Sequence, residues 1–408
     1  MRSGWQARAI GDVCAIKPPK SEARAALSSE DLVSFVPMED LPIGSTTLSL
    51  KQERRLSEVV NGYTYFADGD VLLAKITPCF ENGKLGIAAD LKNGAGFGSS
   101  EYIVLRPDST VISEWLYYYL ERESFRREGA ARMSGAVGHK RVPQAFIEQY
   151  PLPVPPLAEQ RRIVAVLDQA FEAIEAAKAN TAKNLLNAQE LFESELNAAL
   201  TFPANGKTTE TTLGNEIELQ VGFAFKSAEF TEVRSDVRLL RGDNIVPGAL
   251  RWDGVKRYPV KDSHMYQQFV LAENDVVLAM DRPWVGGGLK RAQIRSNDLP
   301  CLLVQRVARM RGKAAVDHRF LYYLTGTCKF ISHLVGNQTG LGVPHISGQQ
   351  LKDFVFRKPT LQEQQRIATK LDLIWEKSRK LAASVSRKIG AIVDLKESLL
   401  NDAFAGRL

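Results

Sequence analysis

Two stretches of the chain carry apolar residues at steps of three and four, which is the spacing of a helix that buries one face. The first stretch, from about Leu157 to Leu200, has a stripe of Val164, Leu167, Phe171, Ile174, Leu185, Ala188 and Phe192. The second stretch, after Pro359, has a stripe of Leu371, Trp375, Ala382, Val385, Ile389, Ile392 and Leu399. A helix of about 44 residues is roughly 65 Å long, so neither helix can bury its stripe alone. We expect the two to pack antiparallel as a coiled coil. Two helices that each fold on their own domain are the alternative.

Short apolar clusters bounded by turn residues precede each long helix. Val71-Leu72-Leu73 follows Gly69-Asp70, and Tyr102–Leu105 follows Gly98, so both clusters predict strands. The segment from Trp115 to Leu120 has helical spacing before a charged run, which predicts one helix in a mainly β module. Prolines end the modules, at 151, 153, 155 and 156 in the first and at 359 in the second.

The chain contains an internal sequence repeat of two copies. Leu157-Ala-Glu-Gln-Arg-Arg-Ile163 recurs half the chain later as Leu361-Gln-Glu-Gln-Gln-Arg-Ile367. The modules match more loosely, through Gly69–Ala74 with Asn274–Ala279 and through Tyr118-Tyr119-Leu120 with Tyr322-Tyr323-Leu324. A period this long indicates duplication of a domain plus a helix rather than a solenoid.

The repeat predicts an α+β fold of two globular domains separated by two long antiparallel helices, with internal pseudo-twofold symmetry. The expected boundaries are 1–152 for the first module, 153–204 for the first helix, 205–358 for the second module and 359–408 for the second helix.

Composition adds little to this architecture. A chain of 408 residues with 44% hydrophobic content supports at least two cores. No apolar run reaches the roughly 20 residues of a membrane span, and the N-terminus lacks the apolar core of a signal peptide, so we expect a cytoplasmic protein. The four cysteines are far apart and suggest neither a zinc site nor disulfides.

The distribution of charge is more informative than the net charge of +6. Residues 207–360 carry about seven more basic than acidic side chains, whereas 1–150 is close to neutral. A polyanionic partner is compatible with this balance, and its electrostatic footprint should be lopsided.

Motifs of catalysis are missing from the sequence. It holds no GxxxxGK[ST] loop, no HExxH, no GxSxG and no Asp/Asn-Pro-Pro-aromatic motif of the kind found in amino-methyltransferases. We therefore expect no catalytic residues, no metal site and no cofactor in this chain.

The duplicated helix entrance resembles the signature of a known family. Pro155–Ile163 and Pro359–Ile367 look like the repeated motif of the specificity subunits of type I restriction-modification enzymes, and Gly69–Lys84 is similar to a loop recurrent in their target-recognition domains. The likeness spans essentially the whole chain. Thr360 departs from the pattern, where a second proline would be usual.

The resemblance implies a non-catalytic reader of double-stranded DNA. Each module would be a target-recognition domain for one half-site of a bipartite, asymmetric sequence. The helices would set the gap between half-sites and dock two adenine-N6 methyltransferase subunits, which would bring S-adenosylmethionine. ATP-driven restriction subunits can join such complexes, and no membrane is involved.

Loops rich in Arg, Lys, Asn and Gln are the candidate DNA contacts, because these side chains read base edges in duplex DNA. In the first module they are Lys75, Thr77, Asn82, Lys84, Ser134, His139, Lys140 and Arg141. In the second they are Arg241, Asn244, Arg282, Trp284, Lys290, Arg291, Asn337, Gln338, Thr339 and His345. Any one of them could instead be an ordinary surface residue. Trp284 could stack at DNA or cap the core.

Two rival functions stay open on the residues alone. One is a nuclease or methyltransferase with an unrecognised site, which needs a carboxylate cluster or a cofactor loop. The other is a coiled-coil adaptor that binds proteins without DNA recognition, whose loops need no enrichment in Arg, Asn or Gln.

Overall fold

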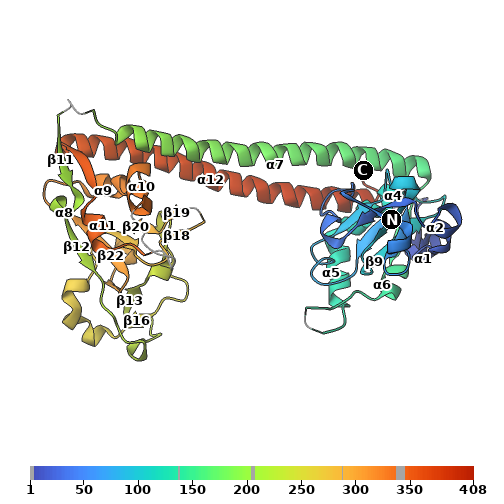
Figure 1. Cartoon of the computed structure of the whole chain (residues 1–408), viewed down its shortest axis with the longest axis horizontal. Coiled ribbons are helices and arrows are strands. Elements are labelled where there is room, and N and C mark those ends of the chain that lie inside the picture. Colours follow the sequence, from blue (N-terminus) through green and yellow to red (C-terminus); the bar gives the residue numbers. More distant parts are fainter. Residues whose placement is uncertain (1–3, 137, 204–206, 287, 337–344) are drawn as a thin grey trace. The chain divides into compact units, whose positions relative to one another are not determined.

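The computed structural model describes residues 4–136, 138–203, 207–286, 288–336 and 345–408. The chain falls into two compact units (Figure 1). Unit 1 comprises Met1–Ala182 and Ser386–Leu408, and unit 2 comprises Lys183–Val385. In the described part of the chain, no helix combines the length and the apolar content that a bilayer crossing requires.

Unit 1 is built on two sheets of four strands, ordered β2-β9-β6-β7 and β4-β3-β8-β5, and on the strand pair β1-β10. Its strands are β1 (Gln6–Ala9), β2 (Cys14–Ile16), β3 (Leu32–Val36), β4 (Gln52–Arg55), β5 (Thr64–Ala67), β6 (Val71–Ala74), β7 (Leu85–Ile87), β8 (Ala95–Gly98), β9 (Tyr102–Pro107) and β10 (Pro151–Val154). Its short helices are α1 (Ile10–Val13), α2 (Ser21–Ala26), α3 (Leu56–Val59), α4 (Ser113–Glu121), α5 (Glu123–Ala131) and α6 (Gln144–Glu148), with 3-10 turns η1 (Met38–Asp40) and η2 (Lys92–Gly94).

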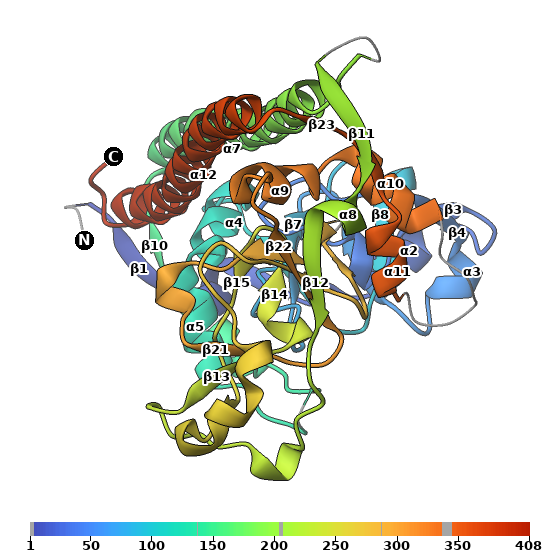
Figure 2. The same cartoon turned by 90° about the vertical axis from the view of Figure 1, so that its left-hand side faces the viewer.

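Unit 2 repeats this plan with sheets β12-β22-β17-β20 and β16-β13-β21 and the pair β11-β23. These strands are β11 (Thr208–Thr212), β12 (Ile217–Val221), β13 (Val237–Leu240), β16 (Arg257–Tyr258), β17 (Val276–Ala279), β20 (Arg291–Gln293), β21 (Cys301–Leu303), β22 (Val307–Gly312) and β23 (Val355–Pro359). The hairpins β14 (Ile245–Val246)–β15 (Ala249–Leu250) and β18 (Trp284–Val285)–β19 (Gly288–Leu289) stand beside them. The helices are α8 (Leu213–Glu216), α9 (His318–Leu324), α10 (Cys328–Gly336) and α11 (Gly348–Lys352), with η3 (Ser227–Glu229), η4 (Gly242–Asn244), η5 (Val260–Phe269) and η6 (Ser296–Asp298). Figure 2 turns this unit to the viewer, with β13 and β21 at the end away from its long helices.

The central strand of each unit, β6 or β17, has a continuously apolar sequence because both of its faces are buried. Val71 and Leu73 of β6 join one core cluster, whereas Leu72 and Ala74 join another. Successive side chains of a strand point to opposite faces, so β6 is buried on both sides. In β17, Val276 and Leu278 likewise face a different cluster from Val277 and Ala279.

A buried ion pair marks the same point in both units. Asp70, which precedes β6, is fully buried and receives two bonds from the guanidinium of Arg106, at 2.6 and 2.8 Å. Asp275 receives the same pair from Arg311, at 2.7 and 2.8 Å. A buried carboxylate needs such a partner, because an uncompensated buried charge is strongly destabilising. The internal repeat expected from the sequence is thus confirmed in the topology of the two units.

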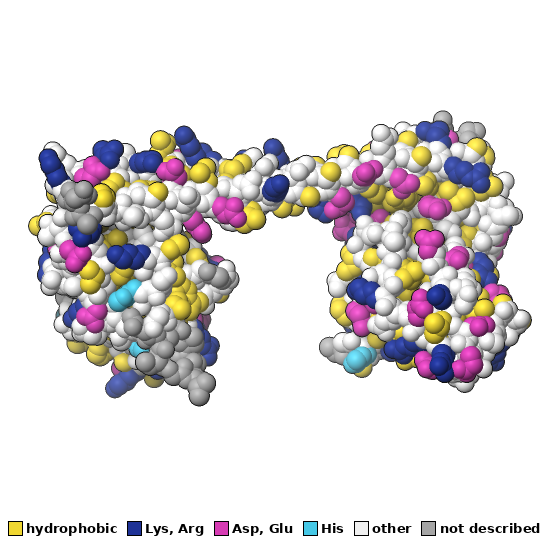
Figure 3. All heavy atoms as spheres, turned by 45° about the horizontal axis from the view of Figure 1, so that its top comes forward, with side chains coloured by type: hydrophobic (Ala, Val, Ile, Leu, Met, Phe, Trp, Pro, Cys, Tyr) yellow, Lys and Arg dark blue, Asp and Glu magenta, His cyan; other side chains and the backbone are white. Residues whose placement is uncertain are grey.

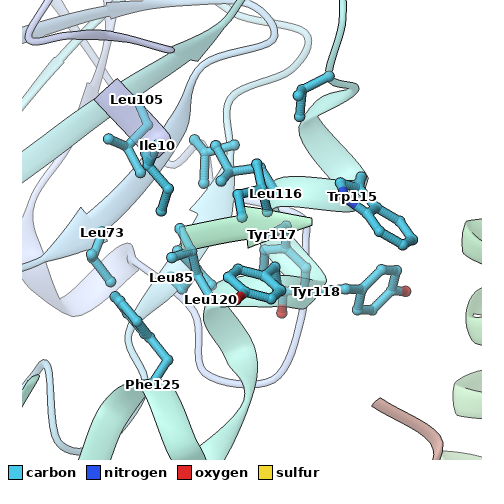
Figure 4. Close-up of a cluster of buried hydrophobic side chains, with 14 of the residues drawn as sticks. Ile10, Leu73, Leu85, Leu105, Trp115, Leu116, Tyr117, Tyr118, Leu120 and Phe125 are labelled. Atoms are coloured by element: carbon cyan, nitrogen blue, oxygen red, sulfur yellow. The ribbon is translucent and has the colours of Figure 1, made fainter. Parts of the chain in front are cut away.

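The main core of unit 1 lies between the β2-β9-β6-β7 sheet and α4. In Figure 4, Leu73, Leu85 and Leu105 from the sheet meet side chains of α4 and α5. Burying each such leucine stabilises the fold by about 1.5–3 kcal/mol relative to exposure. The helix predicted around Trp115–Leu120 is confirmed as α4. The prediction of one helix was wrong, because the charged run after α4 forms α5 around the buried Phe125.

The two long helices are α7 (Leu157–Ala199) and α12 (Leu361–Phe404). In unit 1 the first part of α7 packs with the last part of α12, through Ile163, Leu167 and Leu400 in the core of that unit. In unit 2 the last part of α7 packs with the first part of α12, where the rings of Phe192 and Trp375 are 5.0 Å apart. The helices therefore run antiparallel within each unit. The predicted apolar stripes are buried or partly buried along their length.

The glutamine of the repeated Glu-Gln-Arg entrance ties each long helix to its module. Gln160 is fully buried; its amide donates to the carbonyls of Thr110 and Pro155, both at 2.8 Å, and accepts the N–H of Ile112 at 3.0 Å. Gln364 does the same in unit 2, with Ala315, Pro359 and Asp317. The module and the start of the helix are therefore locked by the same three-bond clamp in both units, which accounts for the glutamine in the motif.

One part of the predicted repeat was out of register. Tyr118 donates to Asp168 of α7, and the corresponding bond to Asp372 of α12, at 2.7 Å, comes from Tyr323. Tyr118 is therefore equivalent to Tyr323, rather than to Tyr322 as the sequence alignment had it. The first copy has three adjacent tyrosines (residues 117–119) and the second has two (residues 322 and 323), which allowed the slip of one residue.

We expect Gln160→Leu to lower the free energy of unfolding of unit 1 by roughly 2–4 kcal/mol, since it leaves a buried N–H and two carbonyls without partners. Urea unfolding of the full chain, with hydrogen exchange to assign the change to unit 1, measures the effect. Arg161→Gln, next to it on the exposed helix surface, should change stability by no more than about 0.5 kcal/mol. Equal stability of the two variants would show that the clamp does not hold the module.

Candidate nucleic-acid interface

Three segments converge at one end of the central sheet in each unit. In unit 1 they are the loop after β6, the turn before β9 and the segment that follows α5. Main-chain bonds join them: the N–H of Lys75 donates to Glu101 at 3.0 Å, and that of Val142 donates to Lys75 at 2.9 Å. In unit 2, Met280 takes the place of Lys75, with the N–H of Met280 donating to Arg306 and that of Ile346 donating to Met280, both at 2.8 Å.

Isolated bridges give the register of the two surfaces. Ile76 pairs with Arg141 in unit 1, and Asp281 pairs with His345 in unit 2. Residues 76 and 281, 101 and 306, and 141 and 345 therefore occupy equivalent places. The scaffold is the same in both units, and the side chains differ.

Cations surround a carboxylate at this place in unit 1. Arg141 donates to both oxygens of Glu101, at 2.6 and 2.9 Å, and this hydrogen bonding holds the pKa of Glu101 below its ordinary value. Lys75 Nζ lies 3.8 Å from the same carboxylate. Burial, followed by repulsion from Lys17, lowers the pKa of Lys75.

Other predicted residues of unit 1 differ in how accessible they are. Asn82, Ser134, His139 and Lys140 are exposed. The hydroxyl of Thr77 donates to Met133 Sδ at 3.7 Å. Lys84 has a structural place, because its ammonium donates to the carbonyls of Met38 and Leu41 at 2.6 and 3.1 Å.

In unit 2 the equivalent surface is hollowed into a cavity of about 590 Å³. Its wall contains Arg241, Gly242, Asp243, Asp281, Arg282, Lys290, Val304, Gln305, Arg306 and His345. The sequence predicted Arg241, Arg282, Lys290 and His345 as contacts from loops far apart in the chain, and the structure brings these four together.

Asp281 organises one wall of the cavity. One of its oxygens bonds His345 Nδ1, and the other lies 2.6 Å from the guanidinium of Arg306. Burial acts to raise the pKa of Asp281, but the bond with His345 and the charge of Arg306 outweigh it and hold the pKa below its ordinary value. Burial lowers the pKa of Lys290, which also lines the cavity.

The remaining predicted residues of unit 2 serve the fold or lie outside the described residues. Asn244 is buried and spans its loop, accepting from the N–H of Arg241 and donating to the carbonyl of Arg251. Arg291 donates to the carbonyl of Tyr322 at 2.8 Å and stacks on its ring. Trp284 packs against the core of unit 2, which favours the capping role over stacking on DNA. Asn337, Gln338 and Thr339 lie outside the described residues.

Sequence reasoning missed Lys17, Glu101 and Arg306 at these surfaces. Lys17 and Arg306 share one feature with Arg282, a positive φ of 53°, 65° and 44° respectively. The other described non-glycine residues with positive φ are Asp90, Asn93 and Asn274. Asp and Asn tolerate this conformation, whereas long side chains are rarely found there. The left-handed backbone at Lys17, Arg282 and Arg306 is therefore a feature that the candidate surfaces share. It could not be predicted from the sequence, because residue type alone does not indicate it.

Basic and acidic side chains are intermingled over the face of each unit that Figure 3 shows, so charge alone does not mark a binding surface on that face. Among the described residues, no group of three His, Cys, Asp or Glu side chains could hold a metal ion. The chemistry at the surfaces is that of hydrogen-bond donors held in place, which suits recognition of an acceptor-rich ligand.

The chain is similar to known proteins that recognise DNA. Residues 2–184 match the family model of the type I restriction modification DNA specificity domain. The specificity subunit of the type I restriction enzyme EcoAI of Escherichia coli is 30% identical, over 93% of this chain and 78% of that protein. The MjaVIII specificity subunit of Methanocaldococcus jannaschii is 27% identical, over 91% and 86%.

Solved structures show the same fold. The HsdS subunit from Thermoanaerobacter tengcongensis aligns over 100% of this chain and 98% of its own, with a TM-score of 0.63 and 18% identity. A chain from a structure of complex assembly and conformational transition in a type I restriction-modification system aligns over 100% and 99%, with a TM-score of 0.82 and 18% identity.

The chain belongs to the specificity subunits of type I restriction enzymes. Such subunits supply DNA sequence specificity and are the non-catalytic components of their complexes. Family membership therefore supports the prediction of a DNA-reading subunit. It argues against the two alternatives, a nuclease or methyltransferase and an adaptor that binds only proteins.

We expect Arg282→Ala to weaken specific DNA binding and to relax base selection at one half-site only, because this exposed side chain faces the cavity of unit 2. Non-specific affinity and its dependence on salt should change little. Binding of the full chain to a set of single-base variants of its target, at several salt concentrations, measures both quantities. A uniform loss of affinity for all sequences would assign Arg282 to the phosphate backbone instead.

Proposed function

We propose that the chain reads a bipartite, asymmetric DNA sequence, with one half-site for each unit. In this proposal residues 1–152 and 205–358 are the two target-recognition domains, and the helical segments 153–204 and 359–408 set the gap between half-sites. The observation that carries it is the pair of equivalent surfaces on one scaffold, which hold Lys75, Glu101 and Arg141 in unit 1 but Asp281, Arg306 and His345 in unit 2. Equal scaffolds with unlike side chains suit two unlike half-sites.

The DNA contacts proposed for unit 1 are Lys75, Thr77, Asn82, Ser134, His139, Lys140 and Arg141, now joined by Lys17. Those proposed for unit 2 are Arg241, Arg282, Lys290, Asn337, Gln338, Thr339 and His345, now joined by Arg306. Lys84, Asn244, Trp284 and Arg291 are proposed to support these loops from within, because their polar or aromatic groups are engaged by the protein.

The long helices are proposed to dock two adenine-N6 methyltransferase subunits, which would bring S-adenosylmethionine; ATP-driven restriction subunits can then join. Two identical partners need two equivalent surfaces, and the repeat provides them. Leu191 and Leu395 occupy matching positions and are 60% and 49% exposed. The helix entrances carry matching ion pairs, Glu159–Arg162 and Glu363–Arg366.

Methylation mapping tests the reading of DNA. When the chain is coexpressed with its methyltransferase, we expect methylated adenines within one split, asymmetric motif. Half-site centres about one helical turn, or about 10 bp, apart would suit two modules that approach one face of the DNA. A short palindromic motif, or an absence of methylation in cells that contain both proteins, would contradict the proposal.

Substitution of the matched leucines tests the docking. Leu191→Asp and Leu395→Asp should each reduce the complex from two methyltransferase subunits to one, since a charge replaces an apolar contact. Light scattering of the purified complex gives the stoichiometry. Leu373 is a matched control, because it is also exposed (56%) on α12 but has Gln169, a polar residue, at the equivalent position of α7. Leu373→Asp should keep both subunits, and the same loss in all three variants would argue against two equivalent docking surfaces.

A further inference from the structure

An ion pair lies beside the turn before β9 in unit 1 and beside the equivalent turn before β22 in unit 2, but the partner of the turn residue comes from a different segment in each unit. In unit 1 the carboxylate is Glu101 on the turn before β9, and the guanidinium is Arg141 on the segment after α5. In unit 2 the guanidinium is Arg306 on the turn before β22, and the carboxylate is Asp281 on the loop after β17. The charge at equivalent positions 101 and 306 is thereby reversed.

Stability does not explain why both units keep this pair. The side chains of Arg141 and Arg306 are 46% and 69% exposed. Exposed ion pairs contribute a median of only about 0–1 kcal/mol. The segments are already joined by main-chain bonds through Lys75 and Met280, so the ion pair is not needed to close the surface.

The geometry in unit 1 leaves part of the arginine available. A guanidinium has five N–H donors in a planar fork. Arg141 directs Nε and one terminal nitrogen at Glu101, and its other terminal nitrogen donates to the carbonyl of His139 at 3.1 Å. Two donors, one on each terminal nitrogen, remain without a partner in the described residues. A carboxylate that fixes one side of the fork therefore aims its other side outward.

Arg306 is held in a similar way. One terminal nitrogen lies 2.6 Å from Asp281, whose second oxygen is bonded to His345. Its side chain stands in the wall of the cavity, next to Arg241, Arg282 and Lys290. Arg306 has a left-handed backbone, which is strained for arginine, whereas glycine would adopt it freely. The turn by itself would therefore favour glycine, and the strained arginine is kept because it provides a guanidinium at this position.

We propose that Arg141 and Arg306 are specificity-determining residues that each read one guanine, with Glu101 and Asp281 as the residues that position them. The inference rests on the proposed reading of one half-site by each unit. Two parallel donors of a fixed guanidinium match the O6 and N7 acceptors of guanine in the major groove, which is the commonest specific contact in DNA recognition. Because the arginine stands on different segments in the two units, each half-site has its guanine at a different place relative to the common scaffold.

The test is selection of duplexes from a randomised pool by the full chain in complex with its methyltransferase. Arg306→Lys keeps the charge but loses the planar fork. It should reduce discrimination for guanine at one position of one half-site by roughly 5- to 150-fold, and leave the other half-site and the salt dependence of non-specific binding unchanged. Arg141→Lys should do the same in the opposite half-site. Arg234→Lys, the same change at an exposed arginine of unit 2 outside the cavity wall, is the control.

A second pair of variants separates positioning from folding. Glu101→Gln and Asp281→Asn remove a negative charge, so non-specific affinity should rise, while selection for the corresponding guanine falls because the arginine is no longer held. A purely structural role would lower both. If the wild-type complex selects a split motif and Arg306→Lys and Arg141→Lys match the Arg234→Lys control, this inference is wrong while the proposed function stands. If the wild-type complex selects no motif, the proposed function itself fails.

Discussion

The hydrogen-bonded clamp of Gln160 and Gln364 is the constraint on which the rest of the architecture depends. A helix of 43 or 44 residues with a single apolar stripe has no orientation of its own relative to a globular module. The buried carboxamide gives it one, because its three bonds are to main-chain atoms of the segments that enter α4 or α9 and the helix. An amide with both a donor and an acceptor can satisfy an N–H and two carbonyls at once, which aspartate, glutamate or an apolar residue could not do. The Tyr118–Asp168 and Tyr323–Asp372 bonds add a second attachment about two turns further along each helix.

Inside each module, the buried Asp70–Arg106 or Asp275–Arg311 pair holds the start of the central strand, and the candidate DNA-binding surface lies at the other end of the same strand. The loops there are joined to one another by main-chain bonds, so the side chains that face outward from them carry little of the fold. This division explains how two units with the same strand order present such different chemistry: an Arg–Glu pair beside Lys75 in unit 1, and a cavity lined by Arg241, Arg282, Lys290 and Arg306 in unit 2.

The sequence predicted the features that repeat along the chain. Helix periodicity located α7 and α12 and their buried stripes, and the apolar clusters at Val71 and Tyr102 located β6 and β9. It also predicted the duplicated entrance, although the role of Gln160 appears only with its partners from residues 110 and 112. The error of register at Tyr118 arose because three adjacent tyrosines in the first copy can be aligned with the two in the second copy in either of two ways. α5 was missed because its one buried side chain, Phe125, lies in a run of charges without visible periodicity.

The candidate surfaces were harder to predict, for reasons that are also physical. Composition identified loops rich in Arg, Lys and Asn, but it could not tell a side chain that faces outward from one that fills its own loop. Lys84 and Lys290 occupy equivalent places, and one is bonded to carbonyls of Met38 and Leu41 while the other lines a cavity. Arg306 was missed because its left-handed turn contains no glycine from which the turn could be predicted. Glu101 was missed because only basic and amide side chains were considered as candidate DNA contacts.

The main-chain bonds through Lys75 and Met280 have a consequence for how such a protein can evolve. Because they involve only N–H and carbonyl groups, any side chain at positions 101, 141, 281, 306 or 345 can be replaced without breaking the frame. A single nucleotide change in the gene can therefore alter a contact without the cost of refolding the domain. Under the proposed function, point mutations at these positions would give new specificities, while the main-chain frame would be inherited unchanged.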